Sequence, residues 1–220
     1  MKSNDRLPAP ISPEPPVIAA PAKKYLALGD SYTIGQSVPE ADRYPVQTKK
    51  GLASQGINMN NPEIIATTGW TTGNLQNAIA VLNPAGPYDV VSLLIGVNDQ
   101  YQYHDTTGYR QRFLNLLITA IQLAGNHPDR VFVLSIPDYS VTPFAQYSDT
   151  AFIRRQIDQF NAINKEVTLQ NYCSYLDITP STREAAHDLS LIAIDGLHPS
   201  GKEYKKWADR LGPMMKTVLQ

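Results

Sequence analysis

A serine near the start of the chain and an Asp–His pair near its end have side chains suited to nucleophilic chemistry. Ser31 follows Gly-Asp directly after the apolar stretch 25–28, and Asp195 precedes His198 by three residues. A serine hydroxyl becomes a good nucleophile when a histidine takes its proton, and the histidine works best when a carboxylate holds its tautomer. An Asp-x-x-His turn can place the carboxylate beside the near ring nitrogen and leave the far nitrogen to face the serine.

Each of these signals has a simpler interpretation when it is taken alone. Gly, Asp and Ser are the residues that turns favour, and a D-x-x-H spacing often occurs by chance. We expect Asp30 to hydrogen-bond within its turn rather than to act as a catalytic acid, and Asp99 to organise a loop. The predicted strands and helices around these residues are therefore needed to distinguish a catalytic site from ordinary turns.

Short apolar runs alternate with stretches of helical spacing along most of the chain. The runs that predict strands lie at 24–28, 63–67, 89–95, 130–136 and 173–178. The stretches that predict helices lie at 43–55, 73–82, 107–124, 150–169 and 200–219. Several of the apolar runs are nearly continuous, which is typical of strands covered on both faces. The alternation predicts an α/β protein with a mostly parallel sheet.

Small clusters of glycine and polar residues follow the first three predicted strands. The first cluster contains Ser31, the second Gly69 and Trp70, and the third Asn98. Because ligands bind outside the carboxyl ends of parallel strands, we expect the three clusters to converge on one crevice. The polar loop at 137–149 is long enough to form part of its wall.

Taken in this order, the clusters resemble the four sequence blocks of the SGNH (GDSL-type) esterase/lipase/acylhydrolase family. They read GDSY at 29–32, a glycine at 69, GVND at 96–99 and DGLH at 195–198, and the resemblance runs from about residue 25 to residue 205. Tyr32 stands where the family nickname has a leucine, at a position that varies within the family. The resemblance implies a three-layer α/β/α sandwich with a mostly parallel five-stranded sheet, the flavodoxin-like fold of SGNH hydrolases.

The resemblance also implies a role for each of five residues. Ser31 attacks an ester carbonyl, His198 serves as general base and then as general acid, and Asp195 orients the imidazole. The oxyanion hole consists of the backbone N–H groups of Ser31 and Gly69 and the side chain of Asn98. On the simpler interpretation, Gly69 only permits a tight turn and Asn98 only caps the next segment.

The expected substrate is a small-molecule acyl ester, a lipid or an acylated carbohydrate, with a short or medium acyl chain. Trp70 could line the acyl pocket or only pack against the core, and Tyr101 is expected to shape the mouth of the site. The mechanism needs no cofactor, and no metal site is expected. No G-x-S-x-G elbow is present, so the α/β-hydrolase fold is not supported.

Three other functions compete with an esterase. An acyltransferase would use the same triad and pass the acyl group to an alcohol. A non-catalytic carbohydrate- or lipid-binding module would keep the fold without turnover, but the presence of Ser31, Asp195 and His198 together argues against it. A scaffold protein would act through the first residues of the chain.

Composition limits the classes of protein to consider. The 220 residues are 42% hydrophobic and 18% charged with a formal net charge of −1, as in a single soluble domain without a general attraction to nucleic acid. No apolar run approaches the roughly 18 residues of a transmembrane segment. Cys173 is the only cysteine, so no intrachain disulfide forms, and it is expected to be buried.

The prolines of the first residues separate a leader from the rest of the chain. We expect a Pro-rich leader or tether at 1–22 and an SGNH hydrolase domain at 23–220. The leader alone suggests a periplasmic, surface-tethered or secreted protein, and the sequence also permits a cytoplasmic one.

Overall fold

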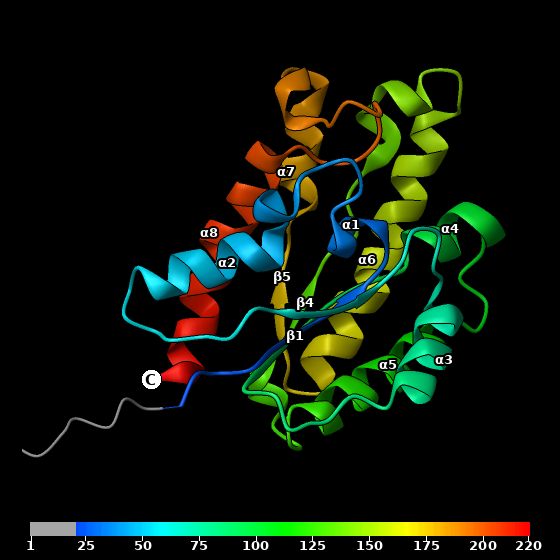
Figure 1. The fold of residues 1–220 in the computed structure, drawn as a ribbon. Coiled ribbons are helices and arrows are strands. Elements are labelled where there is room, and N and C mark those ends of the chain that lie inside the picture. Colours follow the sequence, from blue (N-terminus) through cyan, green and yellow to red (C-terminus); the bar gives the residue numbers. More distant parts are fainter. Residues whose placement is uncertain (1–20) are drawn as a thin grey trace, which may run out of the picture.

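A five-stranded parallel sheet forms the centre of the computed structural model, which describes residues 21–220 (Figure 1). The strand order is β2-β1-β3-β4-β5. The strands are β1 (Tyr25–Gly29), β2 (Glu63–Ala66), β3 (Val90–Leu94), β4 (Val131–Leu134) and β5 (Ser174–Leu176). This order makes β1 and β3 neighbours, with Gly29 paired to Leu94, so the segments that follow them start side by side. Residues 1–20 of the predicted leader lie outside the described residues.

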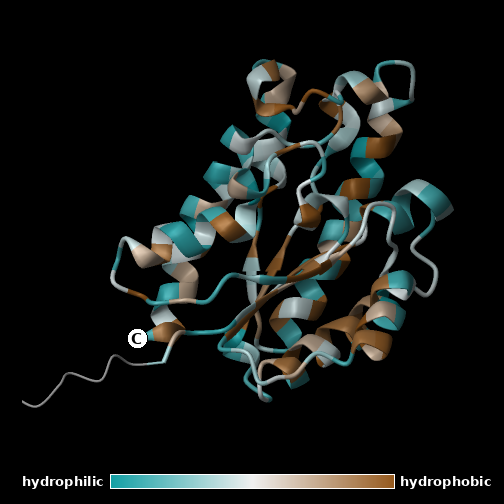
Figure 2. Cartoon of the chain, viewed as in Figure 1, coloured by the Kyte–Doolittle hydropathy of each residue, from teal (hydrophilic) through white to brown (hydrophobic). Residues whose placement is uncertain are grey.

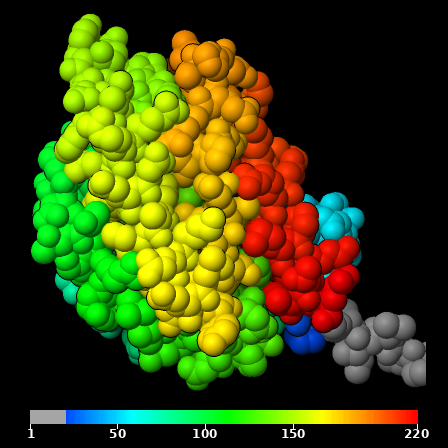
Figure 3. Space-filling model, turned by 180° about the vertical axis from the view of Figure 1, so that it is seen from behind, coloured from blue at the N-terminus to red at the C-terminus, as the bar shows by residue number. Residues whose placement is uncertain are grey.

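Helices cover both faces of the sheet and complete a three-layer sandwich. One face carries α2 (Tyr44–Ala53) and α8 (Gly201–Leu219), which pack against each other. The other carries α3 (Thr72–Leu82), α5 (Tyr109–Leu123) and α6 (Thr150–Gln170). Seen from behind, α6 lies between α5 and α8 (Figure 3). The predicted fold is confirmed, and each predicted strand and helix is present with its ends displaced by a few residues at most.

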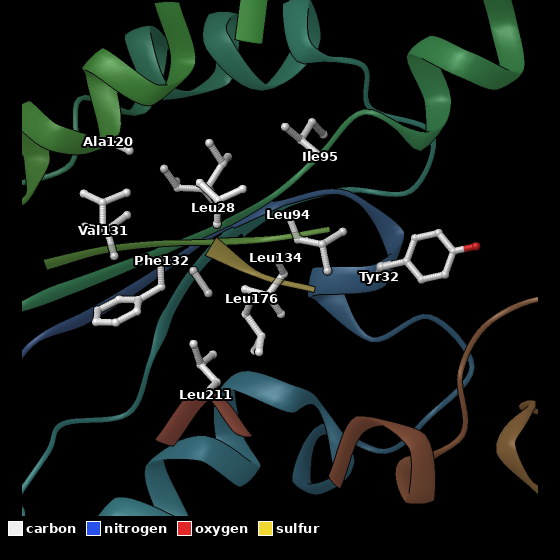
Figure 4. Packing of buried hydrophobic residues seen from close by; sticks show 14 of the residues in the cluster. Leu28, Tyr32, Leu94, Ile95, Ala120, Val131, Phe132, Leu134, Leu176 and Leu211 are labelled. Atoms are coloured by element: carbon white, nitrogen blue, oxygen red, sulfur yellow. The ribbon is translucent and has the colours of Figure 1, made fainter. Parts of the chain in front are cut away.

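The core explains why the strands have nearly continuous apolar sequences. Successive residues of a strand point to opposite faces, and here both faces are covered by helices. Val131 lies on the side of Ala120 in α5, whereas Phe132 lies on the side of Leu211 in α8 (Figure 4). All four side chains are at most 1% exposed. The central strands are mostly coloured as hydrophobic, whereas the helices alternate between hydrophilic and hydrophobic residues (Figure 2).

Local signals in the sequence mark where the long helices begin. The carboxylate of Asp149 accepts the N–H of Phe152 at 2.8 Å and so caps the N-terminus of α6. Ser200 has the corresponding role for α8, where its hydroxyl faces the N–H of Glu203. Cys173 is buried as predicted, and burial raises the pKa of its thiol to about 12.

Three short α-helices in residues 21–220 were not predicted: α1 (Ser31–Ile34), α4 (Val97–Tyr103) and α7 (Thr179–Arg183). Each is too short to show a helical period in the sequence. The first two follow β1 and β3 after no more than two intervening residues; α1 carries the last two residues of the GDSY block and α4 the last three of the GVND block. Within residues 21–220, no helix is both long and apolar enough to cross a membrane.

Candidate active site

The end of β1 explains why the apolar run stops on glycine, aspartate and serine. A Cβ on Gly29 would lie 2.1 Å from the Thr33 hydroxyl and 2.4 Å from the Leu94 carbonyl oxygen, so no side chain fits there. Asp30 then caps α1, because its carboxylate accepts the N–H of Tyr32 at 3.0 Å. Ser31 is therefore the first residue of a short helix at the carboxyl edge of the sheet.

A tight turn near the end of the chain holds Asp195 against His198. Asp195 Oδ1 accepts the backbone N–H groups of Leu197 at 2.9 Å and of His198 at 3.0 Å. Asp195 Oδ2 lies 2.6 Å from His198 Nδ1. His198 is buried, with 6% of the residue exposed. With Nδ1 bonded to the carboxylate, the other ring nitrogen of His198 is left to act as a base.

A fourth hydrogen bond to Asp195 comes from a residue that the sequence analysis did not single out. The Ser37 hydroxyl donates to Asp195 Oδ2 at 2.6 Å, across 158 positions of sequence. Partial burial raises the pKa of the Asp195 carboxyl, but hydrogen bonds from Ser37 and from His198 outweigh burial and hold that pKa well below its usual range. No motif in the sequence could have indicated Ser37, because only the folding of its loop brings it to Asp195.

A pocket of about 130 Å³ lies beside these residues. Its lining residues are Ser31, Tyr32, Val97, Asn98, Tyr101, Tyr139, Phe144, Leu197 and His198. Four of the predicted site residues therefore line one cavity, although they come from three separate parts of the sequence: Ser31, Asn98, Tyr101 and His198. The rings of Tyr32 and His198 lie 5.1 Å apart, so the imidazole packs on the residue next to Ser31. Within residues 21–220, the Ser31 hydroxyl and the His198 ring make no direct hydrogen bond with each other.

Gly69 and Trp70 lie in the adjoining loop and are not among the residues that line this pocket. Gly69 has a φ of +83°, so its backbone conformation rather than lack of space favours glycine there. Asn98 Nδ2 donates to the Trp70 carbonyl at 3.0 Å, and Gln102 Nε2 donates to the Gly69 carbonyl at 3.2 Å. These two hydrogen bonds therefore connect the loop of Gly69 and Trp70 to α4. Contact of Trp70 with a substrate stays a prediction.

The arrangement of these segments matches a known family along most of the chain. The model of the GDSL-like lipase/acylhydrolase family matches residues 27–206. The chain belongs to this family. The match includes each of the four blocks noted in the sequence. A search of the curated proteins gave no match.

Solved structures similar to this GDSL-family chain share its fold at low sequence identity. TesA is 17% identical with a TM-score of 0.69, over 89% of this chain and 99% of TesA. The psychrotrophic esterase EstA from Pseudoalteromonas sp. is 14% identical with a TM-score of 0.67, over 90% of this chain and 98% of EstA. The acetylxylan esterase Axe2 from Geobacillus stearothermophilus is 20% identical with a TM-score of 0.61, over 88% of this chain and 94% of Axe2.

Three aromatic rings separate the pocket of this GDSL-family site from a second cavity. The rings of Tyr101, Tyr139 and Phe144 pack on one another with centroids 6.2 to 6.3 Å apart and contribute to both cavities. The second cavity is about 340 Å³. It is completed by His104, Ser148, Asp149, Phe152 and Ile153. The loop 137–149 therefore supplies part of the wall, as the sequence predicted.

No group of three or more His, Cys, Asp or Glu side chains in the described part of the chain is arranged to hold a metal ion.

Proposed function

We propose that the chain is a serine-dependent carboxylic ester hydrolase that acts through an acyl-enzyme on Ser31. The observation that carries this proposal is the placement of His198. Its Nδ1 is bonded to Asp195 at 2.6 Å, and its ring lines the same pocket as Ser31 and Asn98. A base with a fixed tautomer beside a serine is the arrangement that acyl transfer requires. Membership in the GDSL family supports the same chemistry.

The first half of the reaction makes the acyl-enzyme. The Ser31 oxygen attacks the carbonyl carbon of the ester while its proton moves to the free ring nitrogen of His198. The tetrahedral intermediate then collapses, the bond from carbon to the leaving oxygen breaks, and the departing alcohol takes the proton from His198. Asp195 stays ionised throughout and stabilises the charged imidazole, which suits a carboxyl whose pKa is held low.

The charge that develops on the carbonyl oxygen needs hydrogen-bond donors directed at it. The Ser31 N–H begins helix α1 and makes no hydrogen bond within residues 21–220. Asn98 gives one amide hydrogen to Trp70 and keeps the second for the pocket. We assign these two donors and the Gly69 N–H to the oxyanion hole. Loss of one such donor typically lowers turnover by roughly 10²- to 10³-fold.

The second half of the reaction releases the acid. A water molecule attacks the acyl carbon and gives its proton to His198. The bond from the acyl carbon to the Ser31 oxygen then breaks, Ser31 recovers the proton from His198, and the carboxylic acid leaves. No cofactor takes part in either half.

The size of the pocket favours a short acyl group next to Ser31. Pockets that enclose drug-sized ligands are roughly 300–1,000 Å³, so a pocket of about 130 Å³ holds a much smaller group. The cavity beyond Tyr101 and Phe144 then accommodates the larger part of the ester. Esters of short acyl chains, including O-acetyl groups of carbohydrates, fit this arrangement, and the name of the acetylxylan esterase Axe2 is consistent with it.

The deciding experiment compares wild type with Ser31→Ala on p-nitrophenyl esters of increasing acyl length. Wild type is expected to turn over the short esters and to take a covalent label from an organophosphonate at Ser31, whereas Ser31→Ala does neither. Ser54→Ala is the matched control, because Ser54 is exposed and its hydroxyl bonds to the Gly51 carbonyl far from the pocket. Absence of both hydrolysis and label in wild type would remove the proposal.

A further inference from the structure

The loop that follows the nucleophile reaches across the site to the carboxylate of the Asp–His pair. The carbonyl of Ser31 accepts the N–H groups of Gly35 at 3.1 Å and Gln36 at 3.0 Å, which fold the chain back at the end of α1. Ser37 comes next, and its hydroxyl donates to Asp195 Oδ2. Ser31 and Asp195 are therefore linked through one short, hydrogen-bonded loop.

The backbone of Ser37 has an uncommon conformation for a residue with a side chain. Its φ is +65°, in the left-handed region that favours glycine. Ser37 is exposed, so burial of its side chain does not account for serine at this position. The hydrogen bond to Asp195 does, because glycine would fit the backbone but has no hydroxyl to donate. Strained residues of this kind occur often at functional sites.

Ser37 and His198 share one oxygen of Asp195. Oδ2 accepts the Ser37 hydroxyl and lies against His198 Nδ1, each at 2.6 Å, whereas Oδ1 is held by two backbone N–H groups. Four hydrogen bonds thus hold both oxygens and prevent rotation of the carboxylate. The Asp195 side chain is 28% exposed, so without Ser37 water would compete for Oδ2 and for its bond to the imidazole.

We propose that Ser37 is a positioning residue for the acyl-transfer reaction, which acts through Asp195 on the orientation of His198. This inference rests on the proposed hydrolase function. Ser37 itself contacts no reacting atom. Its hydroxyl holds Asp195 Oδ2 beside His198 Nδ1, so that the imidazole keeps its orientation at the pocket. Outer partners that orient metal-binding histidines typically change activity by roughly 10- to 100-fold when they are removed, and we expect an effect of similar size for Ser37.

The test separates the hydroxyl of Ser37 from its backbone conformation. Ser37→Gly removes the hydroxyl and relieves the positive φ, so this variant is expected to fold at least as stably as wild type. Its kcat on p-nitrophenyl acetate is expected to fall about tenfold with KM unchanged. Asn126→Gly is the matched control, because Asn126 is also exposed with a positive φ, of 64°, and lies outside the site. Its kcat is expected to equal that of wild type.

A second variant and a spectroscopic signal complete the test. Ser37→Asn retains a hydrogen-bond donor in a residue type that tolerates a positive φ, and is expected to recover part of the kcat that Ser37→Gly loses. The downfield proton resonance of the His198 Nδ1–H is expected in wild type and to shift or broaden in Ser37→Gly, whether or not turnover is measurable. A Ser37→Gly variant with wild-type kcat and an unchanged resonance would overturn the inference. If Ser31→Ala is inactive in the same assays, the hydrolase proposal survives that result.

Discussion

The carboxylate of Asp99 holds the first residue of α3 against α4. Asp99 Oδ2 accepts the N–H of Thr72 at 2.8 Å, and Asp99 Oδ1 accepts the Thr72 hydroxyl at 2.7 Å. Asp99 is completely buried. The contact joins the loop of Gly69 to the helix that carries Asn98, two residues assigned to the oxyanion hole from different parts of the sequence. The predicted role of Asp99 as a loop organiser agrees with this contact.

Replacement of Asp99 should therefore weaken both folding and turnover. Asp99→Ala leaves the Thr72 N–H without its buried acceptor, and the free energy of unfolding is expected to fall by about 2 kcal/mol. The kcat on p-nitrophenyl acetate should fall as well, because Asn98 and the Gly69 loop lose their common anchor. Urea denaturation and steady-state kinetics measure the two effects. Asp99→Asn keeps one acceptor oxygen, so its free energy of unfolding and its kcat should both fall less than those of Asp99→Ala. A lower free energy of unfolding with an unchanged kcat would show that the contact between Asp99 and Thr72 does not support catalysis.

His198 is expected to be the residue most sensitive to substitution apart from Ser31. His198→Ala removes the base that accepts the serine proton, and kcat is expected to fall by roughly 10⁴-fold or more. His127→Ala is the control, because that imidazole is exposed and pairs with Asp129. Steady-state kinetics at saturating ester concentration measures the kcat of both variants. A loss of only a few-fold for His198→Ala would assign the role of base to another group.

Asp30 gives the chain a pH dependence of stability with a definite sign. Burial, opposed in part by the hydrogen bond from the Tyr32 N–H and assisted by the charge of Asp99, raises the pKa of its carboxyl to about 8. In the unfolded chain the same group ionises near pH 3.9. Between these values only the folded chain holds the proton, so rising pH lowers stability.

Substitution of Asp30 by asparagine should remove this pH dependence. Asp30→Asn cannot ionise, and its Oδ1 can still accept the Tyr32 N–H. The Tm of wild type should fall relative to that of Asp30→Asn as the pH rises from about 5 to about 8. Asp188→Asn is the control, because hydrogen bonds from Lys202 and Ser190 lower the pKa of Asp188 to about 2, below the whole range. Parallel curves for wild type and Asp30→Asn would mean that folded Asp30 is already ionised at pH 5.

Phe152 tests the assignment of the second cavity to the larger part of the ester. Its ring is 38% exposed and lines that cavity but not the pocket of Ser31. For Phe152→Ala, the ratio of kcat/KM for a bulky ester to kcat/KM for p-nitrophenyl acetate is expected to fall about tenfold, because an aromatic contact of about 1.5 kcal/mol is lost. Tyr172→Ala is the control, since Tyr172 is 84% exposed just beyond the end of α6. An unchanged ratio would exclude the cavity from substrate binding.

Apolar patterns and contacts between near neighbours were enough to predict the layers of this protein and the local geometry of its motifs. Nearly continuous apolar runs indicate strands that are buried on both faces, and helical periods of three or more turns indicate the helices that cover them. Asp149 caps α6, and Asp195 turns toward His198, through contacts that span three residues. Such features depend on backbone sterics and on hydrogen bonds between near neighbours, so the order of the residues is enough to predict them.

The contacts between residues far apart in the sequence could not be predicted in this way. Ser37 reaches Asp195 across 158 positions, and Thr72 reaches Asp99 across 27. The short helices α1 and α4 were also not predicted from the sequence, because four and seven residues are too few to show a helical period. The length of a connecting loop, the order of strands in the sheet and the packing of helices together determine these contacts. No local sequence pattern predicts these long-range contacts, because they depend on how the whole chain folds.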